Sequence, residues 1–557
     1  MITYCLMMKN GLENYSLIEQ LLFSRVGIKT QEEAVSFLKP SISDGFHDPF
    51  LMRDMEKAVV RIFEAITGGE RIVIYSDYDC DGIPGAVILS DFLRKIGSKN
   101  FSVYIPDRHE EGYGFHSHVV ESTEKNGTKL IITVDVGISS LEAVFLAQSK
   151  GIDVIVTDHH TLPEELPSAF AILHPQVGEY PFPHLSGAGV AWKLVSAFLS
   201  KYREYFGVPE RWEEWLLDMA GFATLSDMVP LVGENRLIAK YGISVLRKNR
   251  RPGIAKLFKK IKMDPATLNE DDLTFMLTPR LNAAGRMDTP YLAYNLLVSE
   301  NDKEAEELAE KLEGMNTTRK TSVAQIMKEV KKKMVERDVP SVLVIGEPDW
   351  RIGVLGLVAS KIVEEYKIPV FTWGRNGDGL IKGSVRSFGG INVFNLMNLA
   401  KEEFNGFGGH SQAGGFSILE ENIFTLEDRL VEKLVELENN SEREELASDS
   451  PISITLGEVD ISFAKRINAF APFGVGNPKP IFELVDAKII ETKSFGKTGD
   501  HLMFTLGDGK GKRIKMISFF AKDKILPETE NPTILANVEI SYFMGREEVR
   551  LRLVEIK

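Results

Sequence analysis

The sequence predicts an α/β protein with a parallel-sheet catalytic domain, a smaller second α/β domain and a C-terminal β-barrel. Three observations support this prediction. Strands and helices alternate from Arg71 onward, a second alternation follows residue 338, and the segment after residue 450 contains short alternating strands. A chain of 557 residues is also too long for one hydrophobic core, so several domains are expected.

The first α/β region follows a helical N-terminal segment, residues 1–65, that is broken near Pro40. Short runs rich in β-branched residues then alternate with helical patterns, which is typical of βαβ units. Each run ends in an acidic residue, and ligands of open parallel sheets bind beyond the carboxyl ends of the strands. The expected strands are 71–77, 130–135 and 153–158, and the expected helices include 84–96 and 139–150.

The rest of the chain divides by composition. A charged, proline-free stretch, 302–337, predicts a long connecting helix, because its heptads are too irregular for a coiled coil. The barrel after the linker is expected to be an OB-fold. The predicted domains are 1–300 (catalytic, with the helical N-terminus), 301–337 (connecting helix), 338–440 (second α/β domain, with strands near 341–346 and 369–373 and a helix over 353–365), a polar linker at 438–450, and 451–557 (OB-fold).

Composition excludes several classes of protein. With 43% hydrophobic and 26% charged residues the chain reads as an ordinary globular protein, and its N-terminus lacks the pattern of a signal peptide. No apolar stretch reaches about 18 residues, so no membrane span is expected. Two cysteines, Cys5 and Cys80, exclude a disulfide framework and favour a reducing cytoplasm. The net charge of −14 means that any polyanion must bind in a local groove, with cations supplying part of the positive charge.

The densest cluster of chemical groups is Ser76-Asp77-Tyr78-Asp79-Cys80-Asp81-Gly82. At strand period the three aspartates point to one side. Carboxylates this close repel one another unless cations neutralise them. Gly82 lets the chain turn into the next helix, and Cys80 faces away as a packing residue. The alternative is an acidic surface turn.

Three later segments add ligands. Asp135 ends the second strand, Asp158-His159-His160 ends the third, and Asp227 follows an apolar helix, where it could instead be a helix cap. Carboxylates mixed with imidazoles suit Mn²⁺ better than Mg²⁺, and the set is too rich for one catalytic zinc. Two ions would polarise a phosphate and generate a nucleophile near neutral pH. The predicted metal ligands are Asp77, Asp79, Asp81, Asp135, His159 and Asp227.

These motifs resemble those of a known family. D-Y-D-C-D-G (77–82), Asp135 and T-D-H-H (157–160) resemble the DHH phosphoesterases, and further segments narrow the resemblance to RecJ-type single-strand exonucleases over residues 50–557. Those segments are E-E-G-Y-G-F (110–115), L-S-G-A-G-V-A (185–191), L-S-D-M-V-P-L (225–231), P-R-L-N-A-A-G-R (279–286), K-G-S-V-R-S (382–387), F-G-G-H (407–410) and A-P-F-G-V-G-N-P-K-P-I-F (471–482).

The resemblance implies a single-stranded-DNA-specific exonuclease that works from the 5′ end, releases 5′-mononucleotides and uses two Mn²⁺ or Mg²⁺ ions in DNA recombination and repair. It implies that Asp135 bridges the ions and that His160 contacts the scissile phosphate. The catalytic set it implies is His160, Asp158, Arg280, Asn282, Arg286 and His410. The substrate-binding set, around a terminal 5′ phosphate, is Arg351, Lys382, Gly383, Ser384, Arg386, Ser387, Gly408 and Gly409.

The resemblance also implies how the strand enters. Bases would stack on aromatic residues of the OB-fold, and lysines and a histidine would contact phosphates, although several of these side chains must be core or solvated. Two departures stand out: Arg351 replaces a histidine, and Phe543 replaces a tryptophan. The candidate stacking residues are Phe495, Phe504, Phe519, Phe520, Tyr542 and Phe543, and the candidate phosphate contacts are Lys493, Lys497 and His501.

Two alternatives remain open. A pyrophosphatase or a phosphodiesterase for oligoribonucleotides or cyclic dinucleotides resembles only the first two domains, and a catalytically dead replisome scaffold would have lost metal ligands. Gly187 and Gly189 could suggest a dinucleotide fingerprint, but the third glycine and the preceding strand are missing. We expect a cytoplasmic monomer that binds single-stranded DNA and no membrane, with a helicase and a single-strand-binding protein as candidate partners.

Overall fold

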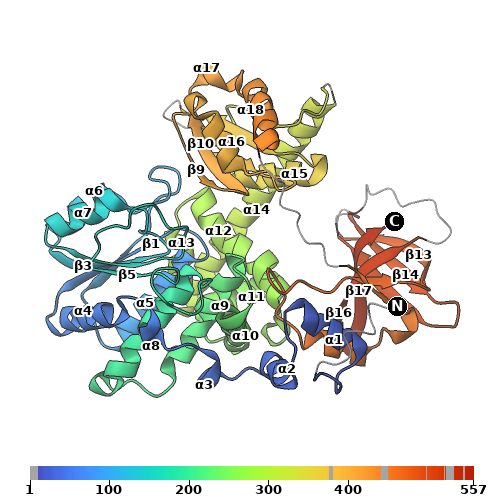
Figure 1. The fold of residues 1–557 in the computed structure, drawn as a ribbon, viewed down its shortest axis with the longest axis horizontal. Coiled ribbons are helices and arrows are strands. Elements are labelled where there is room, and N and C mark those ends of the chain that lie inside the picture. Colours follow the sequence, from blue (N-terminus) through green and yellow to red (C-terminus); the bar gives the residue numbers. More distant parts are fainter. Residues whose placement is uncertain are drawn as a thin grey trace.

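The structure is a computed structural model that describes residues 11–335, 337–375, 380–440, 450–496, 499–519, 521, 532–543 and 546–557. The described residues form three sheets, one in each globular domain. Figure 1 shows the catalytic domain joined through α14 (Asp302–Met334) to the second α/β domain above it. The C-terminal domain lies to the right in this view. The predicted fold class is confirmed.

The catalytic sheet is fully parallel, with the strand order β2-β1-β3-β4-β5. The three predicted strands are present, and two short strands, β2 and β5, flank them at the edges. Side chains alternate between faces: Ile72 and Ile74 pack against α4, α5 and α8, whereas Val73 and Tyr75 pack against α6 and α7. The bounds are β1 Arg71–Ser76, β2 Phe101–Tyr104, β3 Thr128–Val134, β4 Asp153–Thr157, β5 Ala171–Leu173, α4 Met55–Thr67, α5 Gly82–Lys95, α6 Ser117–Lys125, α7 Leu141–Ser149 and α8 Gly187–Phe206.

A helical layer completes this domain and leads into α14. Helices α9 and α10 approach so closely that a Cβ on Gly221 would lie 2.7 Å from the Cα of Gly242. Asn301 caps the N-terminus of α14 by accepting from two backbone N–H groups, and three lysines in its last turn complement the helix dipole. The remaining helices are α9 Leu217–Ser226, α10 Gly233–Leu246, α11 Pro252–Ile261, a π-helix at Asp272–Leu277, α12 Thr278–Met287 and α13 Tyr291–Val298.

The second α/β domain has a mixed sheet with the order β6-β7-β8-β10-β9. The F-G-G-H segment and the glycines that follow it form the β9–β10 hairpin. The predicted linker begins inside α18, and its residues 441–449 lie outside the described part of the chain. The elements are β6 Leu343–Gly346, α15 Leu355–Tyr366, β7 Val370–Arg375, β8 Ile381–Arg386, α16 Val393–Leu399, β9 Gly406–His410, β10 Ala413–Ile418 and α18 Leu426–Asn440.

The C-terminal domain is a seven-stranded sheet with the order β11-β12-β16-β17-β15-β14-β13. Phe504, one of the aromatic residues considered for base stacking, is buried in its core. Phe520 and Lys497 lie outside the described residues, as does the side chain of Phe543. The elements are β11 Ile452–Ile454, α19 Ile461–Asn468, β12 Phe482–Leu484, β13 Lys488–Phe495, β14 His501–Gly507, β15 Arg513–Ser518, β16 Ile534–Phe543 and β17 Arg546–Ile556.

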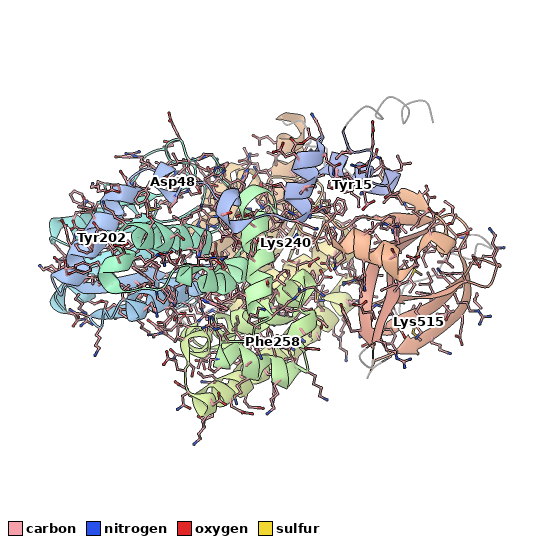
Figure 2. The ribbon with its side chains drawn as sticks, turned by 90° about the horizontal axis from the view of Figure 1, so that it is seen from below. Tyr15, Asp48, Tyr202, Lys240, Phe258 and Lys515 are labelled. Carbon is pink, nitrogen blue, oxygen red and sulfur yellow. The ribbon has the colours of Figure 1, made fainter. Side chains whose placement is uncertain are left out.

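The N-terminal helices differ from the domain assignment made on sequence. Helices α1 (Leu17–Arg25) and α2 (Gln31–Leu38) bury their apolar residues in the core of the C-terminal domain, where the rings of Phe23 and Phe470 lie 4.8 Å apart. Figure 2 shows the segment with Tyr15 between the catalytic domain and the barrel. None of the helices in the described part of the chain is long and apolar enough to span a bilayer.

Candidate metal centre and phosphate-binding surface

The three aspartates of the first motif lie in the turn between β1 and α5, not on a strand as their spacing suggested. The Asp79 carboxylate accepts from the backbone N–H groups of Asp81 and Gly82 at 2.8 and 3.2 Å. Asp81, the N-cap residue of α5, accepts from the N–H groups of Gly187 and Ala188 at 2.6 and 2.8 Å. Backbone donors therefore fix two of the carboxylates.

Asp135 follows β3 and holds a left-handed backbone conformation, with φ = 61°. Such a conformation is costly for a residue other than glycine and collects at functional sites. The start of α8 lies against it: a Cβ on Gly187 would be 2.6 Å from Asp135 Cβ and 2.7 Å from its Oδ1. The closeness of α8 thus confines Asp135 on one side.

The two histidines after β4 both approach the same oxygen of the Asp135 carboxylate. His159 Nε2 is 3.1 Å from Asp135 Oδ1 and 3.5 Å from Asp81 Oδ2. His160 Nδ1 is 3.7 Å from Asp135 Oδ1 and 2.8 Å from Oδ1 of the fully buried Asp158. Asp158 also accepts from the N–H of Ile138 at 2.9 Å, so it orients His160 and is itself held in place.

Tyr113 belongs to the E-E-G-Y-G-F motif but was not predicted as a site residue. Its hydroxyl lies 3.1 Å from His160 Nδ1 and 3.5 Å from the backbone oxygen of Asp135. Only the E-E-G-Y-G-F motif could have pointed to it, because no spacing rule relates residue 113 to residue 160.

Asp227 reaches this cluster from the C-terminal end of α9, with its Oδ2 3.7 Å from His159 Nε2. The structure brings the six predicted metal ligands together. Their donor atoms form two groups within 4.8 Å, namely Asp77, Asp79 and Asp135, and Asp81, His159 and Asp227; a third such group joins His160, predicted as a phosphate contact, to Asp135 and His159.

The electrostatics of the cluster favour a cation. Burial and the neighbouring carboxylates raise the pKa values of Asp77 and Asp135 well above the usual range. Burial and the charges of Asp81 and Asp79 raise the pKa of Asp227 to about 9. Oδ1 of Asp77 and Oδ1 of Asp135 are buried without a well-aligned hydrogen bond from any described residue. Buried, mutually repelling acceptors of this kind fit divalent cations.

His160 has the opposite electrostatic character. Burial alone would lower its pKa, but its hydrogen bond to Asp158 and the surrounding carboxylates raise the pKa to about 9. The pKa of Asp158 falls to about 2, because His160 and the donors around it outweigh the effect of burial. At neutral pH the pair is therefore an imidazolium beside a carboxylate.

Four arginines lie near one another beside the acidic cluster: Arg286 on α12, Arg386 on β8, Arg319 on α14 and Arg108 in the loop between β2 and α6. Burial, followed by the charges of Arg108, Arg386 and Arg319, lowers the pKa of Arg286 to about 9. Asp79 acts in the opposite direction on the same guanidinium, so Arg286 is within electrostatic reach of both the arginines and the carboxylates. Like charges held together in a buried place indicate an anion site. Arg108 and Arg319 were not predicted, since they come from a loop and from the middle of α14.

Arg280, Asn282 and Arg351, which were also predicted to contact phosphate, lie in surroundings that differ from those of Arg286. Arg280 is buried and forms an ion pair with Glu313, with Nε 2.5 Å from Oε2, and it donates to the backbone oxygen of Met276. Asn282 is half-buried on α12. Arg351 is exposed and lines a cavity of about 630 Å³ that also contains Glu329, Glu347 and Asp349.

The predicted terminal-phosphate residues lie on β8 and the β9–β10 hairpin. Arg386 lies against Gly356, where a Cβ would be 2.7 Å from Nη2, and Lys382 Nζ donates to the backbone oxygen of His109 at 3.2 Å. Gly383 makes room for the Phe416 ring, which would lie 2.1 Å from a Cβ. That packing gives Gly383 a structural role.

The same surface continues through the neighbouring residues. Ser384 follows Gly383 on β8, and the Ser387 hydroxyl donates to the backbone oxygen of Ile391. Gly408 faces open space, whereas Gly409 has φ = 142° and would clash with β10 if it carried a Cβ. Burial and the charges of Arg386 and His160 lower the pKa of His410, which places this imidazole near both groups.

The C-terminal domain presents a small aromatic group. The ring centroids of Phe495 and Phe519 lie 5.2 and 5.3 Å from that of His501. The Arg552 guanidinium lies 5.5 Å from the Phe519 centroid. Aromatic rings beside a cation are the groups that bind single-stranded nucleic acid.

Comparison with known proteins gives matches in all three domains. The chain matches the models of the DHH family N-terminal domain over residues 71–223, the DHHA1 domain over 339–436 and the RecJ OB domain over 451–555. It is 31% identical to the single-stranded-DNA-specific exonuclease RecJ of Haemophilus influenzae, over 97% of this chain and 96% of that protein. It is 37% identical to that of Bacillus subtilis, over 88% of this chain but only 61% of the relative's length.

A solved structure is similar over nearly the whole chain. The crystal structure of RecJ in complex with Mn²⁺ from Thermus thermophilus superposes with a TM-score of 0.79 at 25% identity, covering 97% of this chain and 75% of that one. The crystal structure of exonuclease RecJ bound to manganese covers 71% of this chain and 97% of that one, with a TM-score of 0.61 at 28% identity.

Proposed function

Because the chain belongs to the RecJ family of single-stranded-DNA-specific exonucleases, we propose that it removes nucleotides one at a time from the 5′ end of a single strand. It is a metal-dependent nuclease of the DHH type. Its cofactors are divalent ions, Mn²⁺ or Mg²⁺, for which the acidic cluster supplies ligands. Release of 5′-mononucleotides and a role in recombination and repair are parts of the same proposal.

One observation carries the proposal: the cationic group and the acidic cluster share Arg286. Burial and the charges of Arg108 and Arg386 lower the pKa of Arg286, and the charge of Asp79 raises it. Helix α12 lies against the aspartate turn, where a Cβ on Gly285 would be 3.5 Å from the backbone oxygen of Tyr78. A terminal phosphate held by the arginines would place the next phosphodiester over the carboxylates. Arg is suited to this task because its planar fork binds two phosphate oxygens at once. A phosphate site beside the metal centre favours cutting from an end over cutting internally.

Each residue of the centre has a defined part in the proposed reaction. Asp77, Asp79, Asp81, Asp135, His159 and Asp227 would hold two ions. When bound, the ions would polarise the phosphate and lower the pKa of a nucleophilic water. His160, protonated and oriented by Asp158 and Tyr113, offers a positive N–H that stabilises charge developing on the phosphate oxygens.

The test uses three substrates with Mn²⁺: linear single-stranded DNA with a 5′ phosphate, a circular single strand of the same sequence, and pyrophosphate. We expect the linear strand alone to be degraded. Cutting of the circle would show that a free end is not required. Release of phosphate from pyrophosphate, with the linear strand intact, would place the protein among the small-substrate phosphoesterases instead.

The proposal extends to binding. The OB domain supports single-stranded DNA as the ligand, with Phe495, His501 and Phe519 as the stacking group. We propose in addition that the enzyme acts as a monomer in the cytoplasm and receives its strand from a helicase and a single-strand-binding protein. Size-exclusion chromatography with light scattering tests the monomer, and pull-down from a lysate supplied with single-stranded DNA tests the partners.

A further inference from the structure

Asp227 differs from the other candidate ligands in how it is held. The carboxylate of Asp81 accepts two backbone N–H groups, and Asp135 is enclosed between β3 and α8. Asp227 instead lies at the end of α9, its side chain is 29% exposed, and its Oδ2 is 3.7 Å from His159 Nε2, beyond hydrogen-bond distance. Its backbone N–H donates to the backbone oxygen of Ala223 at 2.9 Å, so α9 holds it from one end and the segment that follows, residues 228–232, from the other.

That segment has a constrained backbone. Met228 adopts φ = 58°, a left-handed conformation that a non-glycine residue keeps only when its surroundings impose it. Asn235 Nδ2 donates to the backbone oxygen of Pro230 at 3.1 Å, and Leu231 is buried. The turn after Asp227 is thus fixed from its far end.

What fixes it on the other side is a loop of the OB domain, residues 471–477. The backbone N–H of Leu231 donates to the backbone oxygen of Val475 at 2.7 Å. A Cβ on Gly474 would lie 2.8 Å from Leu231 Cδ1, and one on Gly476 would lie 3.2 Å from Val232 Cγ1. The loop and the segment are in direct contact on the wall of a cavity of about 170 Å³, which Met228 and Val475 also line.

The loop is rigid enough to act as a support. Gly474 and Asn477 exchange two backbone hydrogen bonds at 2.9 and 3.1 Å. The buried Asn477 side chain donates to the backbone oxygens of Phe470 and Pro472 at 2.9 and 2.8 Å. The conformation of the loop is therefore determined by contacts within the OB domain. The loop contacts the catalytic domain through Leu231.

Arg236 adds a second tether between the same two domains. This buried residue of α10 donates to the backbone oxygens of Ala471 and Pro472 at 3.1 and 3.3 Å, and its guanidinium lies 3.6 Å from the centroid of Phe37 on α2. The loop is thus held where α10, the N-terminal helices and the OB domain meet.

We propose that loop 471–477 of the OB domain is a positioning element for Asp227, so that docking of the OB domain sets the affinity of the ion that Asp81, His159 and Asp227 would share. This rests on the proposed two-metal function and goes beyond it, because a strand-binding domain then also assembles part of the catalytic centre. Val475 and Gly476 position a ligand and touch no substrate.

The test compares matched glycine variants by counting bound Mn²⁺ with electron paramagnetic resonance of the free ion, in the absence of DNA. Gly476→Ala adds a methyl at φ = 76° against Val232 and Pro230. Gly509→Ala is the control, because it adds the same methyl at φ = 73° in the same domain, where nothing lies within 4 Å. Asp227→Asn is the reference for loss of the ligand itself.

We expect wild type and Gly509→Ala to bind two ions. We expect Gly476→Ala to bind one ion normally and the other about tenfold or more weakly, as Asp227→Asn does, since mutation of groups that orient a ligand costs about 10–100-fold in metal affinity. Its nuclease activity should need more Mn²⁺ and recover when Mn²⁺ is saturating, which a merely misfolded variant would not do.

Other results overturn the proposal. If a folded Gly476→Ala binds two ions with normal affinity, the loop does not position Asp227. If Gly509→Ala loses as much Mn²⁺ affinity as Gly476→Ala, the effect comes from backbone strain in general. Should Gly476→Ala fold poorly by circular dichroism, Gly474→Ala, which meets only the flexible end of Leu231, replaces it under the same criteria. A single ion in wild type would overturn the two-metal function as well, so the two failures are distinguishable.

Discussion

Replacing Gly187 by alanine should disable the enzyme although the residue has no side chain of its own. The new Cβ would lie 2.6 Å from Asp135 Cβ, 2.8 Å from its Cα and 2.7 Å from its Oδ1. Carbon atoms in ordinary contact lie about 3.5–4.0 Å apart, so α8 and Asp135 would have to separate by roughly 1 Å. Asp135 follows a buried parallel strand and cannot yield easily. The helix would move instead and weaken the 2.6 Å bond from the Gly187 N–H to Asp81.

Two candidate ligands would thus shift together. A misplacement of about 1 Å costs on the order of 10²-fold in rate, so we expect kcat/KM on 5′-phosphorylated single-stranded DNA with Mn²⁺ to fall about a hundredfold. Gly189→Ala is the control, because its Cβ would meet its nearest neighbours at 3.5–3.6 Å, an ordinary contact. It should keep full activity. A Gly187→Ala enzyme within threefold of Gly189→Ala would refute the reasoning.

Three further predictions concern the groups around the centre. Tyr113→Phe removes the hydroxyl that lies 3.1 Å from His160 Nδ1. Because one hydrogen bond contributes about 1 kcal/mol, we expect kcat to fall about fivefold while KM stays unchanged. An unchanged kcat in single-turnover kinetics would show that Tyr113 does not orient His160. Arg386→Ala should reduce the preference for a 5′-phosphorylated over a 5′-hydroxyl strand by about tenfold or more, because a charge-assisted hydrogen bond is lost. A preference unchanged from that of wild type would place the terminal-phosphate site elsewhere. Mn²⁺ binding should release protons and tighten as the pH rises from 6 to 9, because the pKa of Asp227 is raised to about 9 and the carboxyl keeps its proton below that pH until an ion displaces it. Calorimetry in buffers of different ionisation enthalpy checks this, and binding without proton release would contradict the raised pKa.

The sequence predicted which acidic and imidazole side chains would converge better than it predicted how they do so. Asp77, Asp79 and Asp81 were expected to share one face of a strand, yet β1 ends at Ser76 and they lie in a turn. They still converge, because the turn closes over the carboxyl end of the sheet beside Asp135. Short edge strands such as β5, with three residues, were missed because so few residues carry little periodic signal.

Features that depend on tertiary packing could not be predicted. Arg319 and Arg386 join Arg286 only because α14 and the second domain pack against the catalytic domain, and Arg108 joins it from the loop between β2 and α6. Helices α1 and α2 precede the catalytic domain in sequence, yet their apolar faces complete the core of the C-terminal domain. Amphipathic pattern shows that such a helix needs a partner and does not say which one.

We propose that the enzyme degrades single strands from the 5′ end with one carboxylate cluster that holds metal ions and one phosphate site beside it. The most direct measurement is a time course with a 5′-phosphorylated single strand labelled at its 3′ end, with Mn²⁺, for wild type and Asp135→Ala. We predict a descending ladder of labelled products for wild type, and for Asp135→Ala strand binding without any ladder. Immediate release of the label as a mononucleotide, or hydrolysis by Asp135→Ala within tenfold of wild type, would contradict the claim.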